Sequence, residues 1–189
     1  EKSNSILKIL NTFGDTYAPQ AAQILESLGE VQFVDVTRSE LQSRLNGVHV
    51  IVTGLYPEIT ADVLAAASDL HTIVTVTTNL DHIDLNACQK LGVDVLSLKD
   101  EIEFLDTVTS TAELAFGLMI DLLRQTPWAF NDVKNYEWRR ELFRGQSLRE
   151  KTLGVFGLGR LGRMMVRFGH AFEMKVIAYD HRDGERKAA

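Results

Sequence analysis

The sequence has very little cysteine and no long uncharged apolar stretch. Its one cysteine, Cys88, cannot form a disulfide within the chain, which excludes a disulfide-stabilised domain and favours a reducing, cytoplasmic location. The longest apolar stretch, residues 114–123, contains Asp121 and is shorter than the roughly 20 residues that a membrane-spanning helix needs. Residues 1–10 lack the basic start and long apolar centre of a signal peptide. These absences predict a protein without a membrane partner.

Positive charge is also scarce. The chain has 20 lysine and arginine residues against 26 aspartate and glutamate residues, which gives a formal net charge of −6. Nucleic acids and anionic membranes select basic surfaces, so we expect neither as a partner. The arginines at 139, 140, 144 and 149 are interspersed with Glu137, Glu141 and Glu150. This mixture indicates a salt-bridged surface rather than a nucleic-acid site.

Clusters of metal-ligating residues are missing as well. Asp81, His82 and Asp84 stand close together, but such positions on a turn rarely converge on one ion, and no other ligand lies nearby in the sequence. We interpret them as helix caps and surface polar groups, and we predict no metal site. Cys88 lies three residues from both Leu85 and Leu91, so we expect a core side chain rather than a nucleophile.

The sequence does contain a regular alternation of short apolar runs and helical patterns. Runs rich in valine, isoleucine and leucine, separated by helix-like segments, predict a parallel sheet covered on both faces. Thr60 is expected to cap one helix, and Gly92 to end another in the left-handed conformation. The expected strands span residues 6–10, 31–36, 48–52, 72–76 and 93–98, and the expected helices span 19–28, 40–45, 61–67 and 85–91.

A change of pattern near residues 105–110 predicts a domain boundary. Ser110 and Glu113 have the spacing of a capping box and predict a helix over residues 111–124. Apolar residues lie nearly all round this helix, so it should be buried on most sides. A second helix is expected over residues 127–138, followed by a polar, arginine-rich connector over residues 139–149.

A glycine-rich motif follows this connector. Gly157, Gly159 and Gly162 have the spacing G-x-G-x-x-G directly after an apolar run, and Asp180 ends a second apolar run. A strand, glycine turn, helix, strand and terminal acid in this order predict a dinucleotide site. The first glycine permits a tight turn, the second lets a pyrophosphate approach the backbone, and the third lets the helix pack on the strand. Backbone N–H groups at the helix start would hold the phosphates, and Asp180 would hold the ribose hydroxyls.

Six motifs occur in one order at close spacing: TNLDHIDL (78–85), GVDV (92–95), TAEL (111–114), Trp138, GVFGLGRLG (154–162) and AYD (178–180). In these motifs the sequence resembles the D-isomer-specific 2-hydroxyacid dehydrogenases, the phosphoglycerate dehydrogenase-like group. The resemblance covers residues 72–180, and before residue 72 only the alternating pattern agrees.

The resemblance implies an α/β fold. A flavodoxin-like, parallel-sheet substrate domain, residues 1–108, would precede the first part of a Rossmann NAD-binding domain, residues 109–189. It also implies NAD-dependent hydride transfer between a 2-hydroxy acid and its 2-keto acid, and a homodimer formed with helices at residues 111–138. The family's catalytic Arg, acidic residue and His lie beyond the second strand of the NAD-binding domain, and His170 and His181 do not correspond to them. We therefore assign no catalytic residue in this chain, and we expect a truncated chain that is inactive alone.

The resemblance also assigns binding residues. The backbone N–H groups of Arg160 and Leu161 would contact the pyrophosphate, the Arg160 side chain would reach a phosphate oxygen, and Thr78 would approach the nicotinamide. Asp180 favours NAD over NADP because a 2′-phosphate would face its charge, and Arg182 would partly offset that repulsion. The expected cofactor-binding residues are Thr78, Gly157, Gly159, Arg160, Leu161, Gly162 and Asp180, and the expected substrate-binding residues are Gly54, Leu55, Thr78, Asn79 and Leu80.

Two other functions are compatible with the motifs. One is a non-catalytic, NAD-binding interaction protein of the corepressor kind on the same fold. The other is an unrelated Rossmann enzyme such as a homocysteine hydrolase relative, which the arrangement of the first hundred residues disfavours. An Arg, an acid and a His in the loops downstream of residue 189 would favour the dehydrogenase.

Overall fold

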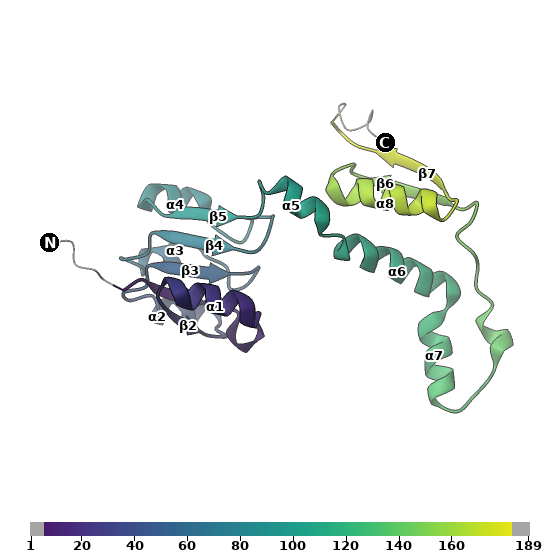
Figure 1. The fold of residues 1–189 in the computed structure, drawn as a ribbon, viewed down its shortest axis with the longest axis horizontal. Helices are drawn as coiled ribbons and strands as arrows, with labels where there is room; N and C mark the ends of the chain where they lie inside the picture. The colour runs from purple at the N-terminus through teal and green to yellow at the C-terminus, as the bar shows by residue number, and fades with distance from the viewer. Residues whose placement is uncertain (1–5, 183–189) are drawn as a thin grey trace. The chain divides into compact units, whose positions relative to one another are not determined.

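A computed structural model describes residues 6–182 (Figure 1). The chain forms two compact units that divide between Ile102 and Glu103, a few residues before the predicted boundary at residue 108. The ends of the two predicted domain ranges, residues 1–5 and 183–189, lie outside the described residues. Within residues 6–182, no helix combines the length and hydrophobicity that crossing a membrane requires.

The first unit is built on a five-stranded parallel sheet with the order β2-β1-β3-β4-β5. The chain runs from β1 to β2 at one edge and then returns to β3 on the other side of β1. This order is the flavodoxin-like one, in which ligands bind beyond the carboxyl ends of the strands. The strands are β1 (Lys8–Asn11), β2 (Glu30–Phe33), β3 (Val50–Thr53), β4 (Thr72–Thr75) and β5 (Asp94–Ser97).

Helices cover both faces of this sheet, as Figure 1 shows. Leu10, Ile51 and Ile73 are completely buried on one face, in a core that includes residues of α2, α3 and α4. Ile9, Val50 and Val52 face the other side, where Leu25 of α1 packs. The predicted fold class is therefore confirmed. The helices are α1 (Pro19–Leu28), α2 (Arg38–Ser43), α3 (Ala61–Ala65) and α4 (Leu85–Leu91), with a short 3-10 helix at Gly14–Thr16.

Each expected strand overlaps an observed one. The helix caps agree with the predictions at two positions and differ at a third. The left-handed end at Gly92 is confirmed, with φ of 70°. Asp84 caps α4 by accepting a hydrogen bond from the Ala87 N–H at 2.9 Å, as expected for a capping residue. Thr60 stands at the cap of α3, but its hydroxyl bonds to the side chain of Asp62 instead of a backbone N–H. Thr60 therefore has the predicted position at the start of the helix, but it does not make the predicted cap hydrogen bond.

The second unit contains helices followed by a two-stranded parallel sheet, β6-β7. Helix α8 connects the two strands and covers one face of the sheet through Leu153, Val155 and Val176. Phe156, Ile177 and Tyr179 are exposed on the other face, where no described residue forms a covering layer. The elements are α5 (Ile102–Thr107), α6 (Ser110–Arg124), α7 (Thr126–Lys134), a 3-10 helix (Arg140–Phe143), β6 (Thr152–Phe156), α8 (Arg160–Ala171) and β7 (Lys175–Tyr179).

Helix α6 differs from expectation in two respects. Its cap is Thr109 rather than Ser110, and the Thr109 hydroxyl donates to Glu113 at 2.5 Å. The helix is also not buried on most sides, because Ala112 and Phe116 are its only buried residues within the described chain. Leu114, Leu118 and Leu122 form a stripe at intervals of four residues, and each of these side chains is more than half exposed.

The arginine-rich connector is a salt-bridged surface, as predicted. Arg139 binds Asp132, a residue of α7 whose side chain is only 6% exposed, and thereby joins α7 to the connector. The other arginines pair on the surface, Arg140 and Arg144 with Glu141 and Arg149 with Glu173. Neutralised in this way, these arginines do not form an open basic patch.

Candidate functional site

The glycine turn joins β6 to α8. Gly157 has φ of +95°, a backbone conformation that residues with a side chain rarely adopt. Its N–H donates to the Tyr179 carbonyl at 2.7 Å, which ties the turn to the end of β7. The predicted reason for a glycine at this position, a tight strand-to-helix turn, is therefore confirmed.

Gly159 is the N-cap residue of α8, and the position that a side chain would occupy there is open space. A Cβ atom built on Gly159 would have only one neighbour within 4 Å, the Nη2 atom of Arg182 at 3.9 Å. No side chain of a described residue caps this helix, and its first turn carries no acid. The N–H groups at the helix start therefore lack partners within the helix and carry the positive end of its dipole. Together these features suit the binding of a pyrophosphate against the backbone.

Gly162 and Gly169 have a different role. A Cβ atom on Gly162 would lie 1.9 Å from the carbonyl oxygen of Gly157, a clash with backbone that no rotamer can relieve. A Cβ atom on Gly169 would lie 2.9 Å from side-chain atoms of Leu153 and Val176. These two glycines let α8 pack closely on β6 and β7. The sequence motif identified Gly162 but gave no sign of Gly169.

Asp180 lies at the end of β7, beside the glycine turn, and is only 3% exposed. Its carboxylate accepts hydrogen bonds from the backbone N–H groups of Arg182 at 2.8 Å and of Leu158 at 2.7 Å. The Arg182 Nε atom also donates to it, at 3.3 Å. These donors lower the pKa of Asp180 far below its usual value, because they stabilise the ionised form. The site thus holds a permanent negative charge one strand away from the glycine turn.

The Arg160 side chain lies elsewhere than expected. Its Nη1 atom donates to the carbonyl oxygens of Leu105 at 2.8 Å and Val108 at 2.6 Å. The guanidinium thereby contacts the end of α5 and the residue that follows it. Its predicted reach to a phosphate oxygen would have to use the Nε or Nη2 groups.

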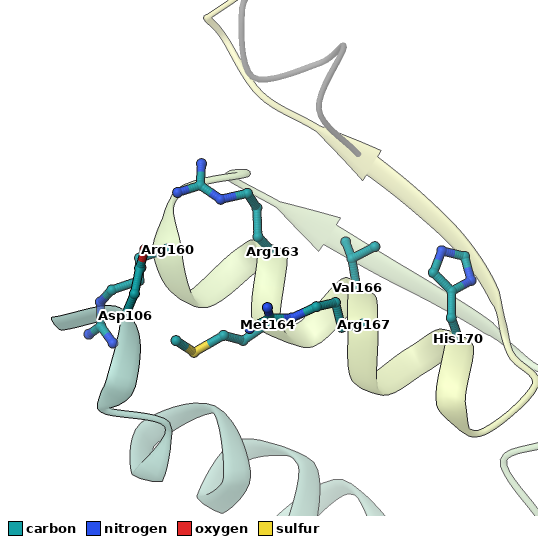
Figure 2. Close-up of a pocket in the computed structure, with 7 residues that line it drawn as sticks. All are labelled: Asp106, Arg160, Arg163, Met164, Val166, Arg167 and His170. Carbon is teal, nitrogen blue, oxygen red and sulfur yellow. The ribbon is translucent and has the colours of Figure 1, made fainter. Parts of the chain in front are cut away.

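A cavity of about 320 Å³ extends along α8 (Figure 2). Figure 2 shows Arg160 beside Asp106, and Arg163, Val166 and His170 rising from the same side of the helix. Three arginines and one aspartate line this surface, in a chain whose net charge is negative. The lining residues are Asp106, Arg160, Arg163, Met164, Val166, Arg167 and His170.

In the first unit, the predicted substrate loops follow the carboxyl ends of β3 and β4, two adjacent strands. Leu55 is more than half exposed after β3, and Gly54 is buried, with the Phe13 ring 3.1 Å from the position of a Cβ atom. After β4, Thr78 and Asn79 are exposed. The Asn79 side chain donates to Asp81 at 2.8 Å, and the Asn79 backbone carbonyl accepts from the Thr77 hydroxyl at 2.7 Å. Leu80 packs against the core and anchors the loop.

The strand ends also bury polar side chains that the sequence analysis missed. Thr12 follows β1 and donates through its hydroxyl to the Thr53 hydroxyl, at the end of β3, at 3.1 Å. Asn11 is completely buried, and its Nδ2 atom has no hydrogen-bond partner in the described chain. Thr75 ends β4 and lies 3.3 Å from His82 Nε2. The sequence signal that could have predicted these buried polar groups was a polar residue at the end of each apolar run.

Cys88 and His82, to which the sequence assigned no catalytic or metal-binding role, are at least partly buried. Cys88 is buried in the core, and this burial raises the pKa of its thiol. Burial also lowers the pKa of His82, which favours the neutral imidazole. Among residues 6–182, no three His, Cys, Asp or Glu side chains are arranged to hold a metal ion.

Comparison with protein families gives two matches. The model for the D-isomer specific 2-hydroxyacid dehydrogenase catalytic domain matches residues 10–152, and the model for the NAD binding domain of the same family matches residues 116–189. A D-3-phosphoglycerate dehydrogenase from Methanocaldococcus jannaschii is 36% identical over 176 residues. That alignment covers 93% of this chain and 32% of the relative, so the chain spans about a third of the relative's length.

Solved structures of similar proteins agree with this fold. A putative D-isomer specific 2-hydroxyacid dehydrogenase from Polaromonas sp. JS6 66 has a TM-score of 0.83 at 24% identity, over 98% of this chain and 59% of that one. A D-lactate dehydrogenase from Aquifex aeolicus, complexed with NAD and lactic acid, has a TM-score of 0.77 at 25% identity, over 95% of this chain and 54% of that one. With the fold, the glycine turn and the family models in agreement, the chain belongs to the D-isomer specific 2-hydroxyacid dehydrogenase family.

Proposed function

We propose that this chain forms the substrate-binding domain and the first part of the cofactor-binding domain of an NAD-dependent D-2-hydroxyacid dehydrogenase. The observation that carries the proposal is the start of α8, where open space at Gly159 adjoins N–H groups without a partner in the helix or in a capping side chain of the described residues, and the ionised Asp180. Gly157, Gly159, Arg160, Leu161 and Gly162 form the pyrophosphate site. Bound NAD would supply the hydride acceptor.

Asp180 selects NAD over NADP in this proposal. A 2′-phosphate would lie against a carboxylate that is already ionised, and that repulsion disfavours NADP. Arg182 donates to the same carboxylate and weakens the repulsion without removing it. Contact with the ribose hydroxyls would be made by the Asp180 oxygens, since each carboxylate oxygen can accept more than one hydrogen bond.

The loops of the first unit bind the 2-hydroxy or 2-keto acid. Gly54, Leu55, Thr78, Asn79 and Leu80 stand beyond the carboxyl ends of β3 and β4, where open parallel sheets bind ligands. Exposed backbone N–H groups in these loops would hold the substrate carboxylate. Thr78 is also the residue proposed to approach the nicotinamide.

A homodimer is part of the proposal. Leu114, Leu118 and Leu122 lie along one side of α6 and are each more than half exposed, and Trp128 and Trp138 are exposed in the segment that follows. Exposed apolar surface of this extent is typical of an interface. A second copy of the chain, packed through the same surface, would cover it symmetrically.

Steady-state kinetics of the full-length protein test the proposed activity. NADH-dependent reduction of hydroxypyruvate, glyoxylate or pyruvate, with oxidation of D- but not L-2-hydroxy acids, is the expected result. The relatives make D-3-phosphoglycerate and D-lactate the first hydroxy acids to assay.

Residues 1–189 alone should show no turnover, because no catalytic residue is assigned among them. Tight NAD binding by the full-length protein without turnover of any of these acids would favour the corepressor-like alternative instead.

A further inference from the structure

Arg160 is in contact with two parts of the second unit. It is the first residue of α8, so its backbone N–H is among those that lack a partner within the helix. Its side chain extends away from the turn, and Nη1 donates to the Leu105 carbonyl at 2.8 Å and the Val108 carbonyl at 2.6 Å. One residue therefore connects the pyrophosphate turn with residues 103–109, which contain most of α5.

That segment depends on outside support. Helix α5 has six residues, too few for a helix to be stable by itself. Leu105 is buried, and its carbonyl also accepts the Val108 N–H at 3.0 Å, which closes the last turn of the helix. A guanidinium at this end satisfies carbonyl groups that the helix leaves without partners, and its charge complements the negative end of the helix dipole. The contact with Arg160 thus stabilises the end of α5.

The rest of the guanidinium remains available as a donor. The Nε and Nη2 atoms of Arg160 have no hydrogen bond to any residue between 6 and 182, and no carboxylate in that range lies within ion-pair distance of them. Asp106 lines the same cavity without forming a salt bridge with Arg160. The charge is therefore not neutralised, and a pyrophosphate at the helix start would be attracted to it.

We propose that Arg160 is a positioning residue that couples occupancy of the pyrophosphate site to the order of residues 103–109. The inference rests on the proposed binding of NAD at this turn. Bound pyrophosphate immobilises Arg160 through its backbone N–H and its remaining donors, and the immobilised guanidinium holds the carbonyls of Leu105 and Val108 more firmly. Since coupling between two sites is reciprocal, loss of the carbonyl contacts weakens the binding of NAD. The compact units divide at the start of this same segment, between Ile102 and Glu103.

Hydrogen exchange of the full-length protein, with and without NAD, tests this coupling. In the wild type, NAD should slow exchange of the Val108 N–H roughly fivefold or more, within the usual range of coupling between sites. Arg160→Gln should abolish that effect and weaken NAD binding by a similar factor. Arg160→Lys keeps the charge but replaces the planar guanidinium whose Nη1 atom bonds both carbonyls, so it should lose the protection of Val108 and, because the coupling is reciprocal, weaken NAD binding by a similar factor. Arg167→Gln is the matched control, because Arg167 lines the same cavity on the same helix without a hydrogen bond to a described residue.

The outcomes separate this inference from the proposed function. If the wild type fails to bind NAD in calorimetry, the proposed function is wrong and this inference falls with it. If NAD binds the wild type but leaves exchange at residues 103–109 unchanged, the inference alone is overturned. It is also overturned if Arg160→Gln and Arg167→Gln weaken NAD binding equally, since the effect would then be one of general charge. Should Arg160→Gln fail to fold, the comparison of Arg160→Lys with wild type decides.

Discussion

The carboxylate of Asp180 accepts a hydrogen bond from the backbone N–H of Leu158 at 2.7 Å. Leu158 stands between the two glycines that open the turn, and Asp180 ends the neighbouring strand. The bond therefore fixes the distance between the acid proposed to hold the ribose and the N–H groups proposed to hold the pyrophosphate. Because Gly157 also donates to the Tyr179 carbonyl, two consecutive residues of the turn are tied to two consecutive residues at the end of β7.

The second and third glycines of the motif should respond differently to alanine. At Gly159 a methyl group enters open space and the backbone φ of −65° suits any residue, so the stability of Gly159→Ala should lie within about 0.5 kcal/mol of wild type. The same methyl group should block the approach of the pyrophosphate and weaken NAD binding at least about tenfold. Gly162→Ala should instead lower the unfolding free energy by about 1–3 kcal/mol, because the methyl group meets backbone.

Calorimetry with NAD and chemical denaturation of the full-length protein measure both effects. Gly117→Ala on α6 is the matched control, since nothing lies within 4 Å of its added methyl group. Its NAD affinity should equal that of wild type. Equal NAD affinity for Gly159→Ala and wild type would contradict the predicted position of the pyrophosphate.

Replacement of Asp180 should alter the choice of cofactor. Asp180→Asn keeps the shape of the side chain but removes the charge that disfavours a 2′-phosphate, so the ratio of NAD to NADP affinity should fall, on the order of tenfold. Separate Kd values for NAD and NADP in the full-length protein check this.

Because hydrogen bonds lower the pKa of Asp180, the carboxylate stays ionised at neutral and mildly acidic pH, and the preference for NAD should not change over that range. An unchanged ratio in the variant would remove Asp180 from the ribose site.

The ion pair between Asp132 and Arg139 should make the stability of the α7 segment dependent on pH. The hydrogen bonds from Arg139 lower the pKa of Asp132, so the pair stabilises the fold above the ordinary carboxyl pKa of about 3.9 and stops doing so as the pH falls through the lowered value. Asp132→Asn should therefore have a lower Tm than wild type at pH 7, and the gap should shrink below pH about 4. Glu26→Gln, an exposed change on α1, is the control. A gap that stays constant from pH 7 into the acidic range would refute the assigned cause.

The exposed leucine stripe of α6 should control association. Leu118→Glu places a charge at its centre and should convert a dimer into a monomer at micromolar concentration. Sedimentation velocity of the full-length protein measures this directly. Leu28→Glu on α1 is a matched change at an equally exposed leucine, and it should leave the dimer intact. Dissociation by both variants, or by neither, would argue against this interface.

The sequence predicted the architecture well because its signals are local and repeated. Apolar runs separated by helical patterns are sufficient to indicate a parallel sheet, and the helices at Pro19–Leu28 and Leu85–Leu91 begin and end where expected. Gly157 was predicted for a tight turn, which its positive φ confirms, and Gly162 for close packing of the helix on the strand, where an added methyl group would meet backbone. These roles depend on neighbours within a few residues, which a motif can encode.

What the sequence did not predict depends on distant partners. The Arg160 side chain bonds to Leu105 and Val108, more than fifty residues away, and nothing in the motif reports that geometry. The burial of α6 was overestimated, because a pattern indicates apolar surface but not whether a neighbouring element covers it. The buried contact between Thr12 and Thr53 likewise required the pairing of β1 with β3.

Assigned amide spectra of the full-length protein, titrated with NAD, test the central claim most directly. The claim is that the N–H groups at the start of α8 bind the pyrophosphate. It predicts that the largest shifts in the second unit occur at the amides of residues 158–162 and saturate together. Saturating binding of NAD that leaves these amides unshifted, with changes only elsewhere in the molecule, would contradict it.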